Sequence, residues 1–130
     1  MQCMAEAKNY EIEISVQTQY VTEESDVSAG RFVFAYSINI RNTGTVSAQL
    51  ISRHWIITDA EGDVQEVRGL GVIGHQPLLA PGQSFEYSSG CVLATPVGTM
   101  KGSYQMTAED GKQFDAPIGE FVLSTPRTLH

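Results

Sequence analysis

The strongest structural signal in the chain is RFVFAYSINI at residues 31–40. Large apolar side chains recur there at every second position, from Phe32 to Ile40, and smaller or polar residues stand between them. Because successive side chains of an extended strand point to opposite faces, this period of two predicts a strand with one buried face. The run from Tyr10 to Tyr20 repeats the pattern. Together the two runs predict a pair of antiparallel strands.

The rest of the chain continues as short strands separated by turns. The run from Val46 to Thr58 predicts one strand with a bulge, or two strands joined end to end, because its apolar residues change parity. Asn42-Thr43-Gly44 predicts a turn, whose glycine can take positive φ. Residues 59–63 and Asp110-Gly111 have the composition of hairpin turns. Further strands are expected at 64–67, 84–88 and 102–107, and from Gln113 onward.

The spacing of these elements predicts the fold class. No window of ten or more residues has a 3.6-residue apolar period with helix caps, and the 5 prolines are scattered. Roughly seven or eight short strands indicate an all-β chain, a single antiparallel β-sandwich of the immunoglobulin or fibronectin type III kind. The length of 130 residues fits one domain over residues 1–130, with a flexible N-terminus over about 1–9.

Charge and composition exclude several classes of partner. The chain has 8 Lys and Arg against 15 Asp and Glu, a net charge of −7. Such a surface repels phosphate backbones and anionic lipids, so we expect no nucleic-acid binding and no membrane insertion. The N-terminal residues 1–8 lack the apolar region of a secretory signal, and Cys3 and Cys91 cannot form a disulfide framework. These features favour a cytoplasmic protein.

One loop matches a nucleotide-binding pattern in its letters. Gly69, Gly71 and Gly74 fit G-x-G-x-x-G, which in a dinucleotide fold follows a strand and opens a helix. A strand precedes the motif here, but Pro77 and Pro81 follow it closely and exclude the helix. The motif then predicts a mobile glycine loop between strands. The alternative is an anion-binding nest of backbone amides, flanked by Arg68 and His75.

An acidic cluster falls in one of the expected hairpin turns. A calcium loop needs glycine at its sixth position and a bidentate Glu at its twelfth. Counted from Asp59, Gly62 is fourth and Leu70 is twelfth. Asp59, Glu61 and Asp63 therefore predict a solvated hairpin tip and no metal site.

Catalytic and zinc-binding patterns are missing from the sequence. His54, His75 and His130 lack zinc-ligand spacing, although the sequence leaves open an assembly of His54, His75 and Cys91 from distant segments. The run SSGC at 88–91 is not the G-x-S-x-G elbow of hydrolases, and Cys91 is expected to be a small core residue. We expect no catalytic residues, no enzymatic activity, no cofactor and no metal ligands.

Three blocks of sequence closely resemble the ApaG family. They are RHWIITD at 53–59, RGLGVIGHQPLLAPG at 68–82 and FEYSSGCVLATPVGTMKGSYQM at 85–106. The resemblance implies one ApaG domain with a fibronectin type III-like sandwich. It also implies an association with cobalt resistance and magnesium efflux, which the bacterial members have, and with a neighbouring gene for a diadenosine tetraphosphate hydrolase. Related domains in eukaryotic F-box and polymerase-interacting proteins look like protein-interaction modules.

Three hypotheses on function follow. The first is a non-enzymatic interaction module associated with Co²⁺ and Mg²⁺ homeostasis, acting through a protein partner at the loop of Arg68, Gly69, Gly71, Gly74 and His75. The second is binding of a nucleotide or pyrophosphate, such as a diadenosine polyphosphate, at residues 69–74, where the family's glycine motif has been considered a pyrophosphate binder. The third is direct binding of a divalent metal. Exposed strand edges would also allow a homodimer through sheet extension.

Overall fold

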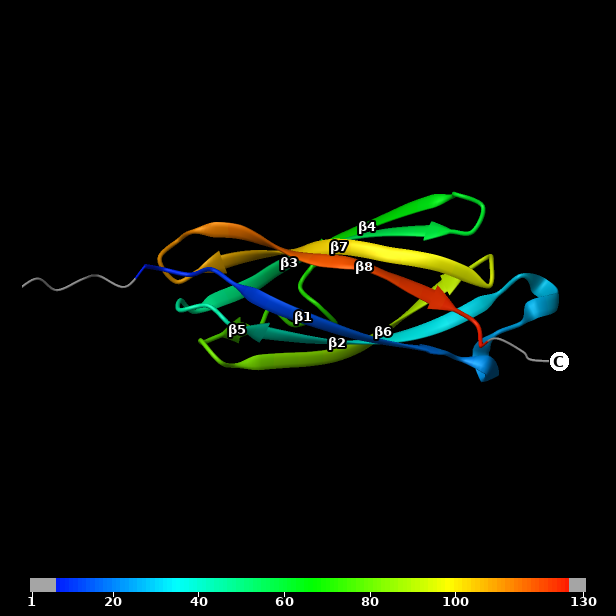
Figure 1. Ribbon diagram of the computed structural model, residues 1–130, viewed down its shortest axis with the longest axis horizontal. Coiled ribbons are helices and arrows are strands. Elements are labelled where there is room, and N and C mark those ends of the chain that lie inside the picture. Colours follow the sequence, from blue (N-terminus) through cyan, green and yellow to red (C-terminus); the bar gives the residue numbers. More distant parts are fainter. Residues whose placement is uncertain (1–6, 127–130) are drawn as a thin grey trace, which may run out of the picture.

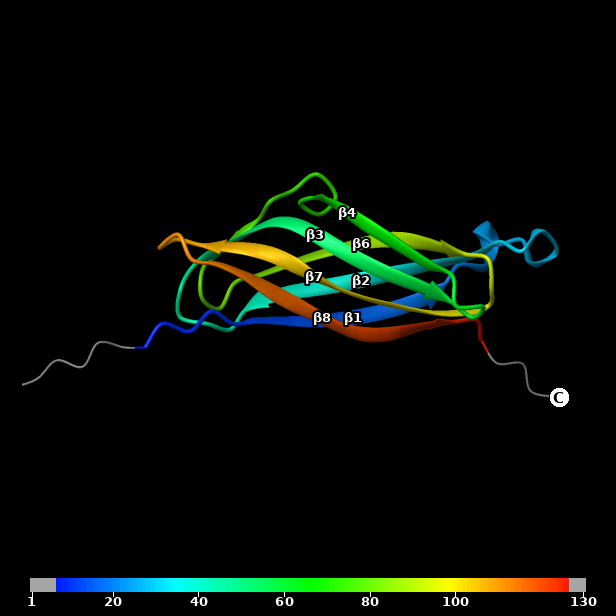
Figure 2. The same cartoon turned by 90° about the horizontal axis from the view of Figure 1, so that it is seen from above.

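A computed structural model describes residues 7–126 and shows two antiparallel sheets packed face to face (Figures 1 and 2). The predicted all-β sandwich of the immunoglobulin and fibronectin type III kind is confirmed. The strands are β1 Ile12–Tyr20, β2 Phe32–Asn42, β3 Ala48–Asp59, β4 Val64–Leu70, β5 Leu78–Leu79, β6 Ser84–Leu93, β7 Val97–Ala108 and β8 Gln113–Ser124. Two 3₁₀ turns, η1 Thr22–Glu24 and η2 Val27–Ala29, separate β1 from β2. No helical segment of the described chain is long and apolar enough to cross a membrane.

The strand order explains which edges of the sandwich are open. One sheet has the order β1-β2-β6 and the other has the order β4-β3-β7-β8, with β5 pairing to β3. At one flank β1 and β8 contact each other, and they close the gap between the sheets. At the opposite flank the edge strands β4 and β6 line a cavity.

Two bulges redirect the alternation of buried residues. In β3 the pairing with β7 shifts between Leu50 and Ser52, which leaves Ile51 without a partner. Buried positions change there from Leu50 on the even parity to Trp55 and Ile57 on the odd parity. Of the two alternatives that the sequence left open, the structure has one strand with a bulge. A second shift, between Met100 and Gly102 of β7, places the extra residue on β8, where the buried positions change from Ile118 to Leu123.

An aromatic cluster at the centre of the core joins the two sheets. The Trp55 ring lies 5.6 Å from Tyr36, 6.3 Å from Tyr104 and 5.9 Å from Phe121, measured between ring centroids. Tyr36 comes from the three-stranded sheet, and the others come from the five-stranded sheet. Truncating a fully buried ring of this size to alanine costs about 3–5 kcal/mol, so the cluster is a large part of what holds the sheets together.

The N-terminal segment is described only from residue 7. Residues 1–6, with Cys3, and His130 at the other end lie outside the described residues. Within the stretch expected to be flexible, the Lys8 ammonium lies 2.9 Å from the Asp110 carboxylate, and the Asn9 amide donates to the Thr45 hydroxyl at 2.8 Å.

Gly44, in the turn after β2, does not use the positive φ that the sequence allowed. A Cβ at Gly44 would lie 2.1 Å from the carbonyl oxygen of Asn9 and 2.8 Å from the amide nitrogen of Glu11. The glycine is therefore needed for close approach of another backbone segment, and not for its turn conformation.

Asn42 is a buried polar group that fixes three backbone groups. Its Nδ2 donates to the carbonyls of Val46 and Leu79, each at 2.9 Å, and its Oδ1 accepts from the amide of Gly44 at 2.9 Å. Only 1% of the residue is exposed. The single side chain thus connects the end of β2 to the next turn and to β5.

We predict that Asn42→Ala lowers the free energy of unfolding by about 2–4 kcal/mol, because buried carbonyls lose their donors. Urea unfolding measures the change. Asn39→Ala, on the same strand but facing away from the core, should change it by no more than about 0.5 kcal/mol. Equal effects of the two substitutions would contradict the role given to Asn42.

Candidate functional site

The glycine motif folds as the end of a strand followed by a two-residue hairpin. Gly69 and Leu70 belong to β4. Val72 and His75 exchange backbone hydrogen bonds of 2.8 and 2.9 Å, and the two residues between them, Ile73 and Gly74, have φ of 42° and 80°. Two consecutive positive φ values are those of a type I′ turn.

This hairpin is anchored to the sandwich, which corrects the prediction of a mobile loop. The carbonyl of Ile51, the bulged residue, accepts from the amide of Gly71 at 2.8 Å and from Nε2 of Gln76 at 2.9 Å. Nε2 of Gln49 donates to the Gln76 carbonyl at 3.0 Å. Val72 is 1% exposed and packs in the core. These contacts hold the segment as an ordered projection from the sheet, and Figure 2 shows it arching outward after β4.

Arg53 binds the base of the hairpin from inside the sandwich. Its Nη1 donates to the carbonyls of Leu70 and Gly71, at 3.0 and 2.9 Å. After the bulge Arg53 shares the inward parity of Trp55 and pairs with the fully buried Tyr104. Sequence reasoning did not select Arg53 as a functional residue. The signal in the sequence was that Arg53 lies two residues before Trp55 and so shares its face of the strand. A cation on the face that points into the core needs a hydrogen-bond acceptor there.

Each glycine of the motif has a structural reason. A Cβ at Gly69 would lie 2.8 Å from three atoms of the Arg53 guanidinium, so the backbone of Gly69 covers that group. A Cβ at Gly71 would lie 2.3 Å from the His75 carbonyl oxygen. Gly74 has open space around it but a φ of 80°. The spacing G-x-G-x-x-G is therefore what the contact with Arg53 and the type I′ turn require.

Few amides of the motif remain for an anion. The amides of Gly71, Val72 and His75 all donate to carbonyls of the chain itself. An anion nest needs successive free amides that point to one place, and these three amides are already bonded within the chain.

The two flanking residues of the proposed nest point to different sheets. Arg68 lies on the outer face of the five-stranded sheet, 3.8 Å from the Glu66 carboxylate, which also contacts Nε2 of His54 at 2.8 Å. The His75 ring packs on Phe85 of the three-stranded sheet, with centroids 5.8 Å apart. The structure does not bring Arg68 and His75 together around one point.

The other candidate ligands are also dispersed. His54 faces outward on β3, whereas Cys91 is buried on β6 and His75 lies on the hairpin. Within residues 7–126, no three His, Cys, Asp or Glu side chains gather as a metal site would need. In the acidic turn, Asp59 accepts from the amides of Glu61 and Asp63, at 2.8 and 3.1 Å.

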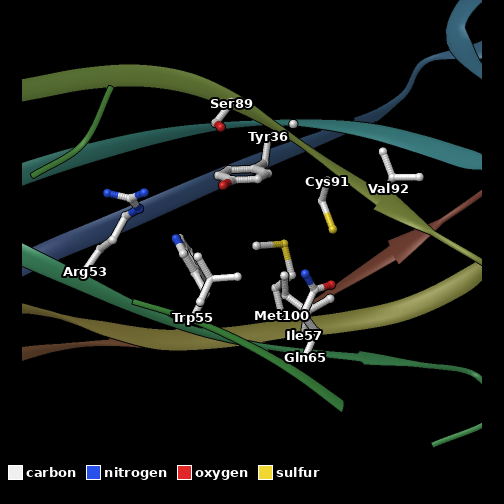
Figure 3. Close-up of a pocket in the computed structure, with 11 residues that line it drawn as sticks. Tyr36, Arg53, Trp55, Ile57, Gln65, Ser89, Cys91, Val92 and Met100 are labelled. Carbon is white, nitrogen blue, oxygen red and sulfur yellow. The ribbon is translucent and has the colours of Figure 1, made fainter. Parts of the chain in front are cut away.

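The open flank holds a cavity of about 420 Å³ that the sequence did not reveal. Figure 3 shows Arg53 and Trp55 on β3 at one side of the cavity, and Tyr36 and Ser89 at the other. Cys91, Val92, Ile57, Met100, Gln65, Val67 and Gly90 complete the lining. Its walls thus combine aromatic and aliphatic side chains with the polar Ser89 and Gln65, and Arg53 is the one charged residue among the described residues of the lining.

Buried hydroxyl and thiol groups in this part of the core, of which Tyr36 and Cys91 line the cavity, stay protonated at neutral pH. Burial raises the pKa of Cys91 to about 11 and that of Tyr87 to about 12, and it raises the pKa of Tyr36 and Tyr104 as well. The Tyr87 and Tyr104 hydroxyls share a hydrogen bond of 2.5 Å. The charge of Arg53 opposes the effect of burial on the three tyrosines. Because the thiolate is the nucleophilic form, Cys91 is a core residue with little reactivity.

The outer side of the hairpin carries exposed apolar side chains. Leu70, Ile73 and Leu78 are exposed by 75%, 55% and 64%. Leu70 pairs with Ser52 and Leu78 pairs with Gln49, so both lie beside β3 and on the sheet face opposite the core. We call these three side chains the hairpin apolar surface.

Comparison with known proteins places these features in a family. The ApaG domain matches residues 22–108. Protein ApaG of Thiobacillus denitrificans is 68% identical over 127 residues, which cover 98% of this chain and 100% of that protein. Protein ApaG of Nitrosospira multiformis is 65% identical with the same coverage. The crystal structure of the Bordetella pertussis protein named ApaA has a TM-score of 0.90 at 58% identity, and the match covers 95% of this chain and 100% of that one.

We predict that the motif glycines are unequal in their effect on stability. Gly71→Ala should cost about 3 kcal/mol or more, because it adds a collision to a positive φ, whereas Gly74→Ala should cost about 1–2 kcal/mol for its φ alone. Gly74→Asn should cost less still, since asparagine tolerates this conformation. Urea unfolding ranks the three variants, and a Gly71→Ala protein as stable as Gly74→Ala would contradict the close contact.

Alkaline pH gives a second prediction. A folded-state pKa of about 11 for Cys91, above its ordinary 9.0, stabilises the fold below the unfolded pKa. This stabilisation is lost as the pH rises through 9 toward 11. The free energy of unfolding should therefore fall less between about pH 8 and about pH 10.5 in Cys91→Ala than in the unmodified chain. Parallel pH profiles of the two proteins would contradict the assignment, because the Cys91 thiol is the group that the substitution removes.

Proposed function

The chain belongs to the ApaG family, and from that premise we propose that it is a non-enzymatic binding module that acts through a protein partner. The partner contact is assigned to the hairpin apolar surface, on the segment that carries Gly69, Gly71, Gly74 and His75. Arg68 stands at its edge as a polar rim. The proposal takes residues 1–130 as one domain in the cytoplasm, and it carries the association with Co²⁺ and Mg²⁺ homeostasis that the family resemblance implies.

The backbone conformation of Ile73 is the observation that carries the proposal. A β-branched residue at φ of 42° is strained by about 1–3 kcal/mol, and type I′ turns favour Asn or Gly at this place. Yet the position holds isoleucine, and 55% of that residue is exposed. An exposed apolar group that costs stability gives nothing to the isolated fold. Its favourable contribution would come from burial against a partner.

The support beneath the hairpin strengthens this argument. The Ile51 carbonyl, the Arg53 guanidinium and buried Val72 hold the segment before any partner arrives. Binding then requires little further ordering of the chain, and ordering is a main cost of association. The three side chains would act as anchors of an interface centre, with polar residues as the rim.

Nucleotide binding at residues 69–74 is the alternative from a different class. The amides of Gly71 and Val72 in this segment, and of His75 next to it, are already used inside the chain, and the net charge of −7 repels polyphosphates. Direct binding of Co²⁺ or Mg²⁺ is the second alternative, and no described group of side chains favours it. Neither alternative explains an isoleucine at the tip of the turn.

Ile73→Asn separates function from stability. We predict that it keeps or raises the free energy of unfolding, because asparagine relieves the positive φ, while it removes the apolar tip and weakens partner binding at least tenfold. A photo-crosslinking residue placed at Leu70 should capture one partner in cells, and Ile73→Asn should abolish that product. Val122, an apolar side chain of β8 exposed by 57%, is the matched control position for both changes.

Several results would overturn the proposal. They are identical crosslinked products from Leu70 and Val122, or capture that survives Ile73→Asn. Titration of diadenosine tetraphosphate, with and without Mg²⁺, should leave the amide resonances of residues 69–75 in place at millimolar ligand. Movement of those resonances would support the nucleotide alternative, and calorimetry with Co²⁺ and Mg²⁺ alone would reveal direct metal binding.

A further inference from the structure

Arg53 provides the starting point, because the hairpin uses only part of its guanidinium. Nη1 makes both hydrogen bonds to the hairpin carbonyls, and no acceptor in residues 7–126 bonds to Nε or Nη2. The described ion pairs involve Lys8, His54 and Arg68, so no described carboxylate pairs with Arg53. A half-buried cation without a counter-charge in the described residues lines a cavity whose other walls are aromatic and aliphatic side chains together with Gln65 and Ser89. Such an arrangement favours a ligand that brings its own carboxylate.

The cavity continues as a groove along the flank between β4 and β6. A second hollow of about 220 Å³ shares Ile57, Gln65 and Val92 with the first, and it ends at Asp59 and Asp63. The groove thus has a guanidinium at one end and two carboxylates at the other, and apolar side chains line it between them together with Gln65 and Ser89. From Gly69 to Val64, β4 advances five residues, which is about 17 Å. This length fits an extended peptide of about five or six residues.

Both banks of the groove are unpaired strand edges. β6 pairs only with β2, and β4 pairs only with β3. Every second residue of an edge strand directs its N–H and C=O away from the sheet, where an added strand can bond to them. β6 has no proline and no bulge, whereas the edge of β8 is interrupted by Pro117 and a register shift. The groove therefore offers main-chain partners as well as apolar walls, which is what strand addition uses.

The groove is closed at the arginine end. The hairpin carbonyls bind Arg53 there, and the His75 ring packs across to Phe85 of β6. A chain lying between β4 and β6 has no room to continue past this contact. A peptide that presents its carboxylate to Arg53 would thus have to end there.

From these observations we propose that the flank between β4 and β6 binds the C-terminal end of an extended peptide. The terminal carboxylate pairs with the free side of the Arg53 guanidinium, and an apolar side chain of the last two residues enters the cavity beside Tyr36 and Trp55. The main chain runs antiparallel to β6. A basic side chain four or five residues before the end lies near Asp59 and Asp63. This site is independent of the hairpin apolar surface, so it stands without the function proposed above.

The chain carries its own reporter for this site. Trp55 is the only tryptophan, and it lines the cavity. Occupation of the cavity should therefore change the tryptophan fluorescence saturably. The probes are a pooled library of hexapeptides with lysine first, an apolar residue last and random residues between, made once with free C-terminal carboxylates and once as amides.

We predict that the immobilised protein retains peptides from the carboxylate pool and not from the amide pool. A retained peptide should bind at least tenfold more weakly as its amide, and the same loss should follow from Arg53→Met. The two losses should not add, because both remove one ion pair. Arg53→Lys, which keeps the charge, should retain part of the affinity.

Matched variants test the other end and the independence of the site. Asp63→Asn should weaken binding a few-fold at low salt, and replacing the peptide lysine by glutamine should remove this difference. Glu13→Gln, which removes an exposed carboxylate from β1 at the opposite flank, should have no effect. Leu78→Ser removes part of the hairpin apolar surface and should leave peptide affinity unchanged.

Four outcomes would overturn the proposal. One is equal retention from the two pools, and another is retention of nothing. The third is N-acetyl-leucine binding as tightly as the hexapeptides, which would assign the cavity to a small carboxylic acid. The fourth is a homodimer in sedimentation that Arg53→Met dissociates, which would assign the flank to a second copy of the chain. The carboxylate-to-amide comparison uses the unmodified protein, so an unstable Arg53 variant does not weaken the test.

Discussion

The bulge at Ile51 is the constraint on which the rest of this architecture depends. One unpaired residue in β3 reverses the parity of the strand, and so turns Arg53 into the sandwich in line with Trp55. The same residue leaves a carbonyl free of the β7 ladder, and that carbonyl accepts from Gly71 and Gln76. The inward direction of the Arg53 guanidinium and the outward projection of the hairpin are thus two consequences of the bulge at Ile51. Bulges near functional surfaces commonly redirect side chains in this way.

The glycine motif shows that a sequence pattern can correctly indicate where a Cβ must be missing and still not indicate which group lies against the backbone there. In a dinucleotide fold, glycines allow a tight turn and close approach of the backbone to a pyrophosphate. Here Gly69 allows close approach to a guanidinium, and Gly71 to a carbonyl oxygen. The requirement for a missing Cβ is the same, and the neighbour differs. Only the following segment distinguishes the two cases, and the two prolines after the motif already exclude a helix.

The local sequence pattern was sufficient to predict most strands, but it could not predict the cavity at the flank between β4 and β6. Alternation predicted β1, β2 and the bulged β3, because each depends on residues within one strand. β5 was missed since two residues carry no period, and β6 was predicted too short because Ser89 and Gly90 interrupt the apolar alternation. The close contact at Gly44 was not predicted because its neighbour, Asn9, is distant in sequence. The cavity was invisible for the same reason: its lining comes from five strands.

One segment of the chain serves both proposed contacts, and its two sides do so differently. Its carbonyls bind Arg53 at the closed end of the groove, whereas its side chains Leu70 and Ile73 face outward. Because Nη1 alone makes the two hydrogen bonds to the hairpin carbonyls, a carboxylate that binds Nε and Nη2 need not break them. The hairpin is ordered on folding by the Ile51 carbonyl and by buried Val72, so neither contact requires the segment to be ordered again on binding. A strained isoleucine and a cation without a counter-charge are both unfavourable in the isolated chain, and a partner that covered either of them would relieve that cost.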